Sequence, residues 1–219
     1  MINFSSGLIF LLGALAALGA AAIDMYLPSL PSIESELGGV GGSAQFTLSS
    51  FFIGLGLGQL FYGPISDSLG RRKVLVVGLL IYCLGSLFCF FAGTMMELIA
   101  ARFFQALGAA AGGVIARAMV RDVFTGKKAA QAQSFINLAF SFTPLMAPLF
   151  GGYLLIFFGW RSIFIALLLF GIICLLILIL KIPETLPKEK RNTLRLVSIV
   201  LGYRTILRNS RSIGSILSG

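Results

Sequence analysis

The chain contains no histidine, only eight acidic residues among its 219, and three cysteines that lie inside apolar runs. Without histidine it lacks the commonest metal ligand and the usual base at neutral pH. Cys83, Cys89 and Cys174 show no metal-ligand spacing, so we interpret them as small buried hydrophobic residues. Phosphate loops, nucleotide fingerprints and nucleophile-plus-base arrangements are missing too. These absences argue against an enzyme and predict that the chain uses no cofactor and no metal.

Charge is also scarce, because charged residues make up 11% of the chain and hydrophobic residues 58%. A soluble domain carries about 25% charged residues. A water-soluble fold of this size could not bury so much apolar surface. The composition therefore indicates that a lipid bilayer is the solvent and a partner of the chain.

Six apolar runs are each long enough to span a bilayer, at about 20 residues per helix. They cover residues 7–27, 44–64, 74–93, 98–119, 132–157 and 162–181. The first run is not typical of a signal peptide, since no Lys or Arg precedes it and no small-residue cleavage site ends it. We expect an all-α integral membrane protein with a six-helix bundle over residues 1–181. A basic cytoplasmic linker is predicted over 182–209, and the start of a truncated seventh helix over 210–219.

The basic residues lie in alternate connections between the apolar runs. All but three of the 17, the exceptions being Arg102, Arg117 and Arg161, fall on one side of the predicted bundle. By the positive-inside rule that side is the cytoplasm, and the N-terminus lies there too. This placement explains the net charge of +9 without nucleic acid as a partner.

Asp24 and Arg102 are ionisable residues predicted to lie in the outer half of the bilayer. A charge in hydrocarbon costs on the order of 3 kcal/mol on insertion scales, so such residues face a wet cavity or a partner. We expect Asp24 to pair with Arg102 across a shared hollow and to exchange a proton against a ligand. The alternatives are an interfacial Asp24 that caps its segment and an Arg102 that snorkels outward.

Two further groups lie on the fourth apolar run. At 100° per residue, Gln105 and Gly112 share a face of the predicted helix with Arg102. Arg117 lies nearer the cytoplasmic end, where snorkelling or pairing with Asp122 is at least as reasonable as a role in transport.

The stretch from Gly63 to Lys73 is predicted to be a short charged turn. Gly63 would permit a close approach of helices and Gly70 a tight turn. Asp67 could accept hydrogen bonds from a helix N-terminus. Arg71 and Arg72 could pair with acids such as Asp122 and form a clasp that opens and closes. A purely topogenic positive turn is the alternative.

Small residues and prolines mark two of the runs. Gly54 and Gly58 have the small-xxx-small spacing of tightly packed membrane helices. The fifth run contains Pro144 and Pro148, which bend a helix and free carbonyl groups. The echo between Leu69–Arg72 and Phe158–Arg161, on opposite sides, is weak support for a 3+3 inverted repeat.

These motifs together resemble the major facilitator superfamily. The stretch 63–72 looks like its signature between helices 2 and 3, with Ser68 where a basic residue is commoner. The stretch 102–108 is similar to its helix 4 motif, with Ala106 in place of a common Gly. The stretch 144–152, which ends in Gly151 and Gly152, is similar to its antiporter motif, with Ala147 in place of Gly.

A narrower resemblance, to the Bcr/CflA-type drug/proton antiporters, rests on residues 24–31, 116–122, 159–161 and 183–187. It implies efflux of small amphipathic drugs against protons, across the bacterial inner (plasma) membrane. It also implies that Asp24 binds substrate or protons and that Arg102 and Gln105 take part in coupling. We predict a site for substrate or protons formed by Asp24, Tyr26, Arg102, Gln105 and Arg117. The predicted conformational motif consists of Gly63, Asp67, Gly70, Arg71, Arg72 and Asp122.

Members of this superfamily have two six-helix halves, and the chain resembles the N-terminal half only. We therefore expect a truncated or split transporter, whose C-terminal half is encoded separately. The alternatives are a non-transporting remnant or subunit, and a uniporter or importer of the same fold.

Overall fold

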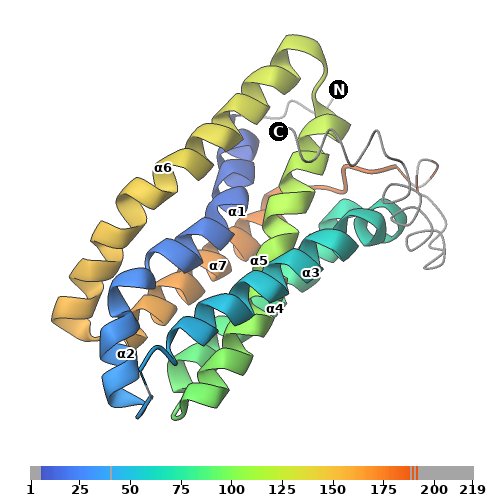
Figure 1. The fold of residues 1–219 in the computed structure, drawn as a ribbon. Helices are drawn as coiled ribbons and strands as arrows, with labels where there is room; N and C mark the ends of the chain where they lie inside the picture. The colour runs from blue at the N-terminus through green and yellow to red at the C-terminus, as the bar shows by residue number, and fades with distance from the viewer. Residues whose placement is uncertain (1–5, 40, 188, 190, 192–219) are drawn as a thin grey trace, which may run out of the picture.

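The computed structural model describes residues 6–39, 41–187, 189 and 191, and its regular structure is helical throughout this part (Figure 1). The elements, in chain order, are α1 (Ser6–Asp24), η1 (Leu27–Ser29), α2 (Leu30–Glu36), α3 (Gln45–Leu69), α4 (Arg71–Phe91), α5 (Met95–Val123), α6 (Gly126–Phe158) and α7 (Arg161–Lys181).

Six of the helical segments in the described residues are long and apolar enough to cross a membrane, with α1, η1 and α2 forming the first. The predicted six-helix, all-α fold is confirmed. Several helices are longer than the apolar runs from which they were predicted. Helix α6 has 33 residues, a length of about 50 Å at 1.5 Å per residue, and α5 has 29 residues. The bounds predicted for the second, fourth and fifth runs were too short. Hydropathy reports the part of a helix that lies in lipid, whereas a helix continues until its backbone is interrupted.

Helix α5 is the packing centre, with α3, α4 and α1 around it. A Cβ atom at Gly54 would approach the Phe103 carbonyl oxygen of α5 to 2.5 Å, and one at Gly58 would approach the Ala110 Cβ to 2.5 Å. The predicted small-residue packing of α3 is therefore confirmed, and its partner is α5.

The turn between α3 and α4 is much shorter than predicted. Helix α3 continues to Leu69 and α4 begins at Arg71, so that only Gly70 is non-helical, with φ 101°. This left-handed conformation favours glycine, which confirms the reason given for Gly70. At Gly63 a Cβ atom would meet nothing within 4 Å among the described residues, so the close approach expected there stays a prediction.

The two ends of the bundle carry different contacts. At one end, which we call the Gly70 end, the α3–α4 turn lies beside the end of α5 and the chain that follows α7. At the other, the Glu36 end, the Glu36 carboxylate accepts hydrogen bonds from Trp160 Nε1 at 2.8 Å and from Arg161 Nη1. Arg161 Nη2 also donates to the Ala92 carbonyl at 3.2 Å. These bonds join α2, the α4–α5 connection and the α6–α7 connection.

The predicted linker is described only in part, at residues 182–187, 189 and 191. The rest of it, together with the predicted start of a seventh helix at 210–219, lies outside the described residues.

Candidate functional site

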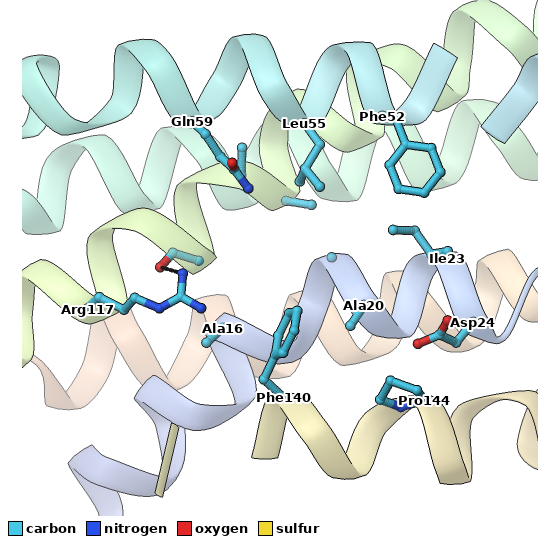
Figure 2. Close-up of a pocket in the computed structure, with 14 residues that line it drawn as sticks. Ala16, Ala20, Ile23, Asp24, Phe52, Leu55, Gln59, Arg117, Phe140 and Pro144 are labelled. Atoms are coloured by element: carbon cyan, nitrogen blue, oxygen red, sulfur yellow. Dashed lines mark hydrogen bonds between the residues drawn. The ribbon is translucent and has the colours of Figure 1, made fainter. Parts of the chain in front are cut away.

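A cavity of about 390 Å³ opens between α1, α3, α5 and α6 (Figure 2). Its lining is mostly apolar and includes Phe52 from α3 and Phe140 from α6. Three polar side chains reach it, each from a different helix: Asp24 from α1, Gln59 from α3 and Arg117 from α5. An apolar hollow with a few convergent polar groups is typical of a small-molecule site.

Asp24 is the last residue of α1, and its carboxylate lies beside Pro144 of α6 at one end of the cavity (Figure 2). Its side chain is half-buried, and no ion pair or hydrogen bond to it occurs among the described residues. The helix ends here because the chain turns into η1, with Pro28 at the start of that turn. Asp24 therefore presents a free carboxylate to the cavity, as a proton or cation site requires.

Arg117 occupies the opposite end of the same cavity (Figure 2). Its Nη1 atom donates to the Gly113 carbonyl of its own helix at 3.3 Å. Asp122, the expected alternative partner, is bound by Arg71. Of the five residues predicted to bind substrate or protons, only Asp24 and Arg117 line the cavity.

Arg102 lies elsewhere, and the predicted Asp24–Arg102 pair does not form in the described structure. Its side chain is fully buried, so outward snorkelling is wrong as well. Arg102 Nη1 donates to the Ala22 carbonyl at 3.1 Å and to Gln105 Oε1 at 2.7 Å. Gln105 Nε2 in turn donates to Ser86 Oγ of α4 at 2.9 Å. The guanidinium thus joins α5 to the end of α1 and, through Gln105, to α4.

The Arg102 guanidinium group packs against aromatic rings, whereas the prediction had placed a carboxylate beside it. The guanidinium carbon lies 4.4 Å from the ring centre of Tyr26 and 4.1 Å from that of Phe51. Such contacts are worth about 2 kcal/mol when the cation is desolvated. The Tyr26 hydroxyl is 2.7 Å from Thr47 Oγ1. Tyr26, Arg102 and Gln105 therefore form a buried polar cluster, which we call the Arg102 core.

A second cluster, which we call the Arg71 clasp, lies at the Gly70 end and comprises Arg71, Asp67, Asp122 and Ser66. Arg71 Nε contacts Asp122 Oδ2 at 2.9 Å, and Arg71 Nη1 donates to Ser66 Oγ at 2.7 Å and pairs with Asp67. The predicted pairing of Arg71 with Asp122 is confirmed. Asp67 of α3 pairs with the Arg71 side chain across the Gly70 turn, and no hydrogen bond from a helix N-terminus to it occurs among the described residues.

Glu184 holds the same turn from the chain that follows α7. Its Oε1 accepts from the backbone N–H of Arg71 at 2.8 Å, so a carboxylate caps the N-terminus of α4, where the helix dipole favours an anion. Arg72 pairs with no acid in the described structure and donates from Nη2 to the Ile179 carbonyl at 2.8 Å. The sequence motif at 183–187 contained Glu184, yet its capping role depends on a contact 113 residues away.

The proline-containing part of α6 lies along α1. The helix runs unbroken through Pro144 and Pro148, and Pro144 lines the cavity. A Cβ atom at Gly151 would collide with the backbone of Met25, whereas one at Gly152 would meet nothing within 4 Å among the described residues. Gly151 therefore permits the close approach of α6 to the end of α1, next to Asp24.

Comparison of the sequence with known proteins identifies a family that the chain matches. The model of the Major Facilitator Superfamily matches residues 9–219. The chain is 44% identical over 186 residues to the uncharacterized MFS-type transporter YdgK of Bacillus subtilis, covering 84% of this chain and 46% of that protein. It is 35% identical to a bicyclomycin resistance protein homolog of Haemophilus influenzae (94% and 52% covered) and 34% identical to multidrug resistance protein D of Escherichia coli (93% and 50%).

Solved structures of transporters share the fold. The human organic anion transporter MFSD10 superposes with a TM-score of 0.65 at 24% identity, covering 84% of this chain and 49% of that one. A bacterial homolog of the human lysosomal transporter Spinster, in an inward-facing and unoccupied conformation, gives 0.69 at 21% identity, covering 86% and 45%. The chain spans about half the length of the curated relatives that it matches.

Proposed function

Because the chain belongs to the Major Facilitator Superfamily, we propose that it forms one wall of the substrate pathway of a proton-coupled multidrug exporter. The observation that carries the proposal is Asp24, a carboxylate without a partner in the described structure, which faces an amphipathic cavity. Two relatives named for bicyclomycin and multidrug resistance support the substrate class.

The proposed coupling is a competition at Asp24. A carboxylate that lacks a fixed cation can bind either a proton or a cationic group of a drug, but not both. Release of the proton on one side of the membrane would then accompany binding of the drug. Arg102 takes no direct part in this exchange; it holds the Ala22 carbonyl, two residues before Asp24, and so positions the end of α1.

We further propose that a second six-helix unit supplies the other wall. The relatives are about twice as long as this chain, which leaves room for such a unit. The cavity opens between α1, α3, α5 and α6, and the helices α3 and α6 are the least buried of the spans. In this proposal the Arg71 clasp opens and closes as the two units move.

Substituting Asp24→Asn is expected to abolish drug-driven proton movement, because an amide neither ionises nor pairs with a cation. The assay uses everted membrane vesicles that contain the chain, expressed with everything that its transcription unit encodes. A proton gradient is established across the vesicle membrane, with the acidic side inside. Ethidium is then added, and proton efflux is followed with a pH-sensitive dye.

The matched control is Glu97→Gln. Glu97 lies outside the cavity and forms a capping box with Thr94, a role that Gln also fills. The control should retain the signal. Full activity of Asp24→Asn would remove this residue from the mechanism, and drug movement that persists after the proton gradient is collapsed would favour a uniporter.

The proposed location is the bacterial inner membrane, with the Gly70 end in the cytoplasm. Its basic residues include Arg72, Lys73, Lys127 and Lys128, whereas the Glu36 end has Glu34 and Glu97.

An impermeant maleimide added to whole cells should therefore label Gly38→Cys and leave Lys128→Cys unlabelled until the cells are opened. The three native cysteines are buried, so the unsubstituted chain gives the background. The reverse pattern would contradict this orientation and the direction of transport derived from it.

A further inference from the structure

We propose that the cavity selects zwitterionic amphipathic molecules, with the cationic group bound at Asp24 and the anionic group at Arg117. This inference rests on the proposed function, since it takes the same cavity as the substrate site, and it adds the charge pattern of the substrate.

The two charged side chains lie at opposite ends of one hollow (Figure 2). The residues of α1 that line the hollow run from Ala16, at the end where Figure 2 draws Arg117, to Asp24 at the other end. Eight residues of helix separate these positions, which corresponds to about 12 Å at 1.5 Å per residue. A ligand that reaches both charges must therefore be elongated and must carry its charged groups near its two ends.

Neither charge has an oppositely charged partner within the described part of the chain. The ion pairs of the described residues involve Arg71, Arg161 and Arg191 as the cations, and none involves Asp24 or Arg117. The nearby acid that could have paired with Arg117 is Asp122, and the Arg71 clasp already holds it. Two free charges of opposite sign in one cavity attract a molecule that carries both signs in the reverse order.

The region between the charges suits a flat apolar body. Phe52 and Leu55 from α3 and Phe140 from α6 line it, and Gln59 is the polar side chain between the ends. A molecule with a cationic group alone would bind Asp24 with Arg117 still unpaired. At an effective dielectric constant of about 20, the repulsion between two unit charges about 12 Å apart lowers affinity roughly tenfold. An anionic group on the same molecule offsets this repulsion, because it lies next to Arg117 and attracts it at a much shorter distance.

The test measures binding of three matched ligands by isothermal titration calorimetry in phosphatidylcholine nanodiscs. The nanodiscs contain the full chain, expressed with everything that its transcription unit encodes. Norfloxacin carries an amine and a carboxylate at opposite ends of a rigid aromatic body, its methyl ester keeps only the amine, and its N-acetyl derivative keeps only the carboxylate. We expect norfloxacin to bind about tenfold more tightly than its ester. Arg117→Gln should abolish this preference, and Arg117→Lys should keep most of it.

The matched control is Arg121→Gln, which removes an exposed arginine one turn further along α5 and outside the cavity; it should leave the preference unchanged. Equal affinity of norfloxacin and its ester, or a preference that survives Arg117→Gln, overturns the inference. The proposed function is tested separately by the ester, whose binding must fall in Asp24→Asn. Ester binding that is insensitive to Asp24→Asn contradicts the proposed function, and failure of all three ligands to bind overturns both proposals.

Discussion

Replacing Gly108 with alanine should greatly reduce the amount of folded protein and lower its melting temperature. A Cβ atom at this position would collide with the backbone nitrogen of Tyr82 and lie 2.6 Å from both the Tyr82 Cα and the Gly78 carbonyl oxygen. All three are backbone atoms of α4, so no side-chain rotation relieves the contact. Helices α4 and α5 must move apart, at a cost of about 1–3 kcal/mol or more.

The damage should extend to the Arg102 core. Three residues before Gly108, Gln105 donates from Nε2 to Ser86 Oγ of α4, and this bond requires the two helices to stay close. Gly85 shows the same constraint from the other helix, since a Cβ atom there would lie 2.5 Å from the Gln105 backbone nitrogen. Loss of the close approach therefore leaves the buried Gln105 amide, which accepts from Arg102, without its partner on α4.

The matched control for Gly108→Ala is Gly56→Ala in α3, which is exposed and where a Cβ atom meets nothing within 4 Å among the described residues. Alanine is favoured over glycine inside a helix by up to about 1 kcal/mol, so this variant should be neutral or slightly more stable. Size-exclusion profiles and thermal melts in detergent compare the two. Equal behaviour of both variants would mean that α4 and α5 are not packed as described.

The six spans could be predicted because each apolar run is long and the charged connections between them are short. The Arg71–Asp122 pair was also within reach, since both residues lie at helix ends on the same side of the bundle. Helical phase put Arg102 and Gln105 on one face of α5, and the 2.7 Å bond between them agrees with it.

What the sequence could not provide was the direction in which that face points. A buried guanidinium can be stabilised by aromatic rings and carbonyl groups as well as by an acid, so the presence of Asp24 did not determine the partner of Arg102. Gln59 was missed in the cavity, although a polar residue inside the second apolar run was a usable signal. The cap by Glu184 depends on a long-range contact that no local pattern indicates.

The second large effect is expected from Arg71→Met, which should lower the free energy of unfolding by about 2 kcal/mol. The Arg71 side chain is only 8% exposed and contacts two carboxylates and a hydroxyl group. Methionine keeps the apolar stem but leaves Asp122, which is 17% exposed, without its cation. Asp67 is 39% exposed, so water compensates for most of its loss and it adds little to the effect.

A double-mutant cycle separates the charge from the packing. Adding Asp122→Asn to Arg71→Met removes the uncompensated carboxylate and should restore more than half of the lost stability, although Asp122→Asn alone is destabilising. The matched control is Arg72→Met. Arg72 Nη2 donates an exposed hydrogen bond to the Ile179 carbonyl, and losing this bond should lower the free energy of unfolding by under about 1 kcal/mol. Thermal melts in detergent of the unsubstituted chain, Arg71→Met, Asp122→Asn and the double variant give the coupling energy between Arg71 and Asp122. Additive effects of Arg71→Met and Asp122→Asn would show that the two side chains do not stabilise the Gly70 end as a pair, and the proposed clasp would lose its physical basis.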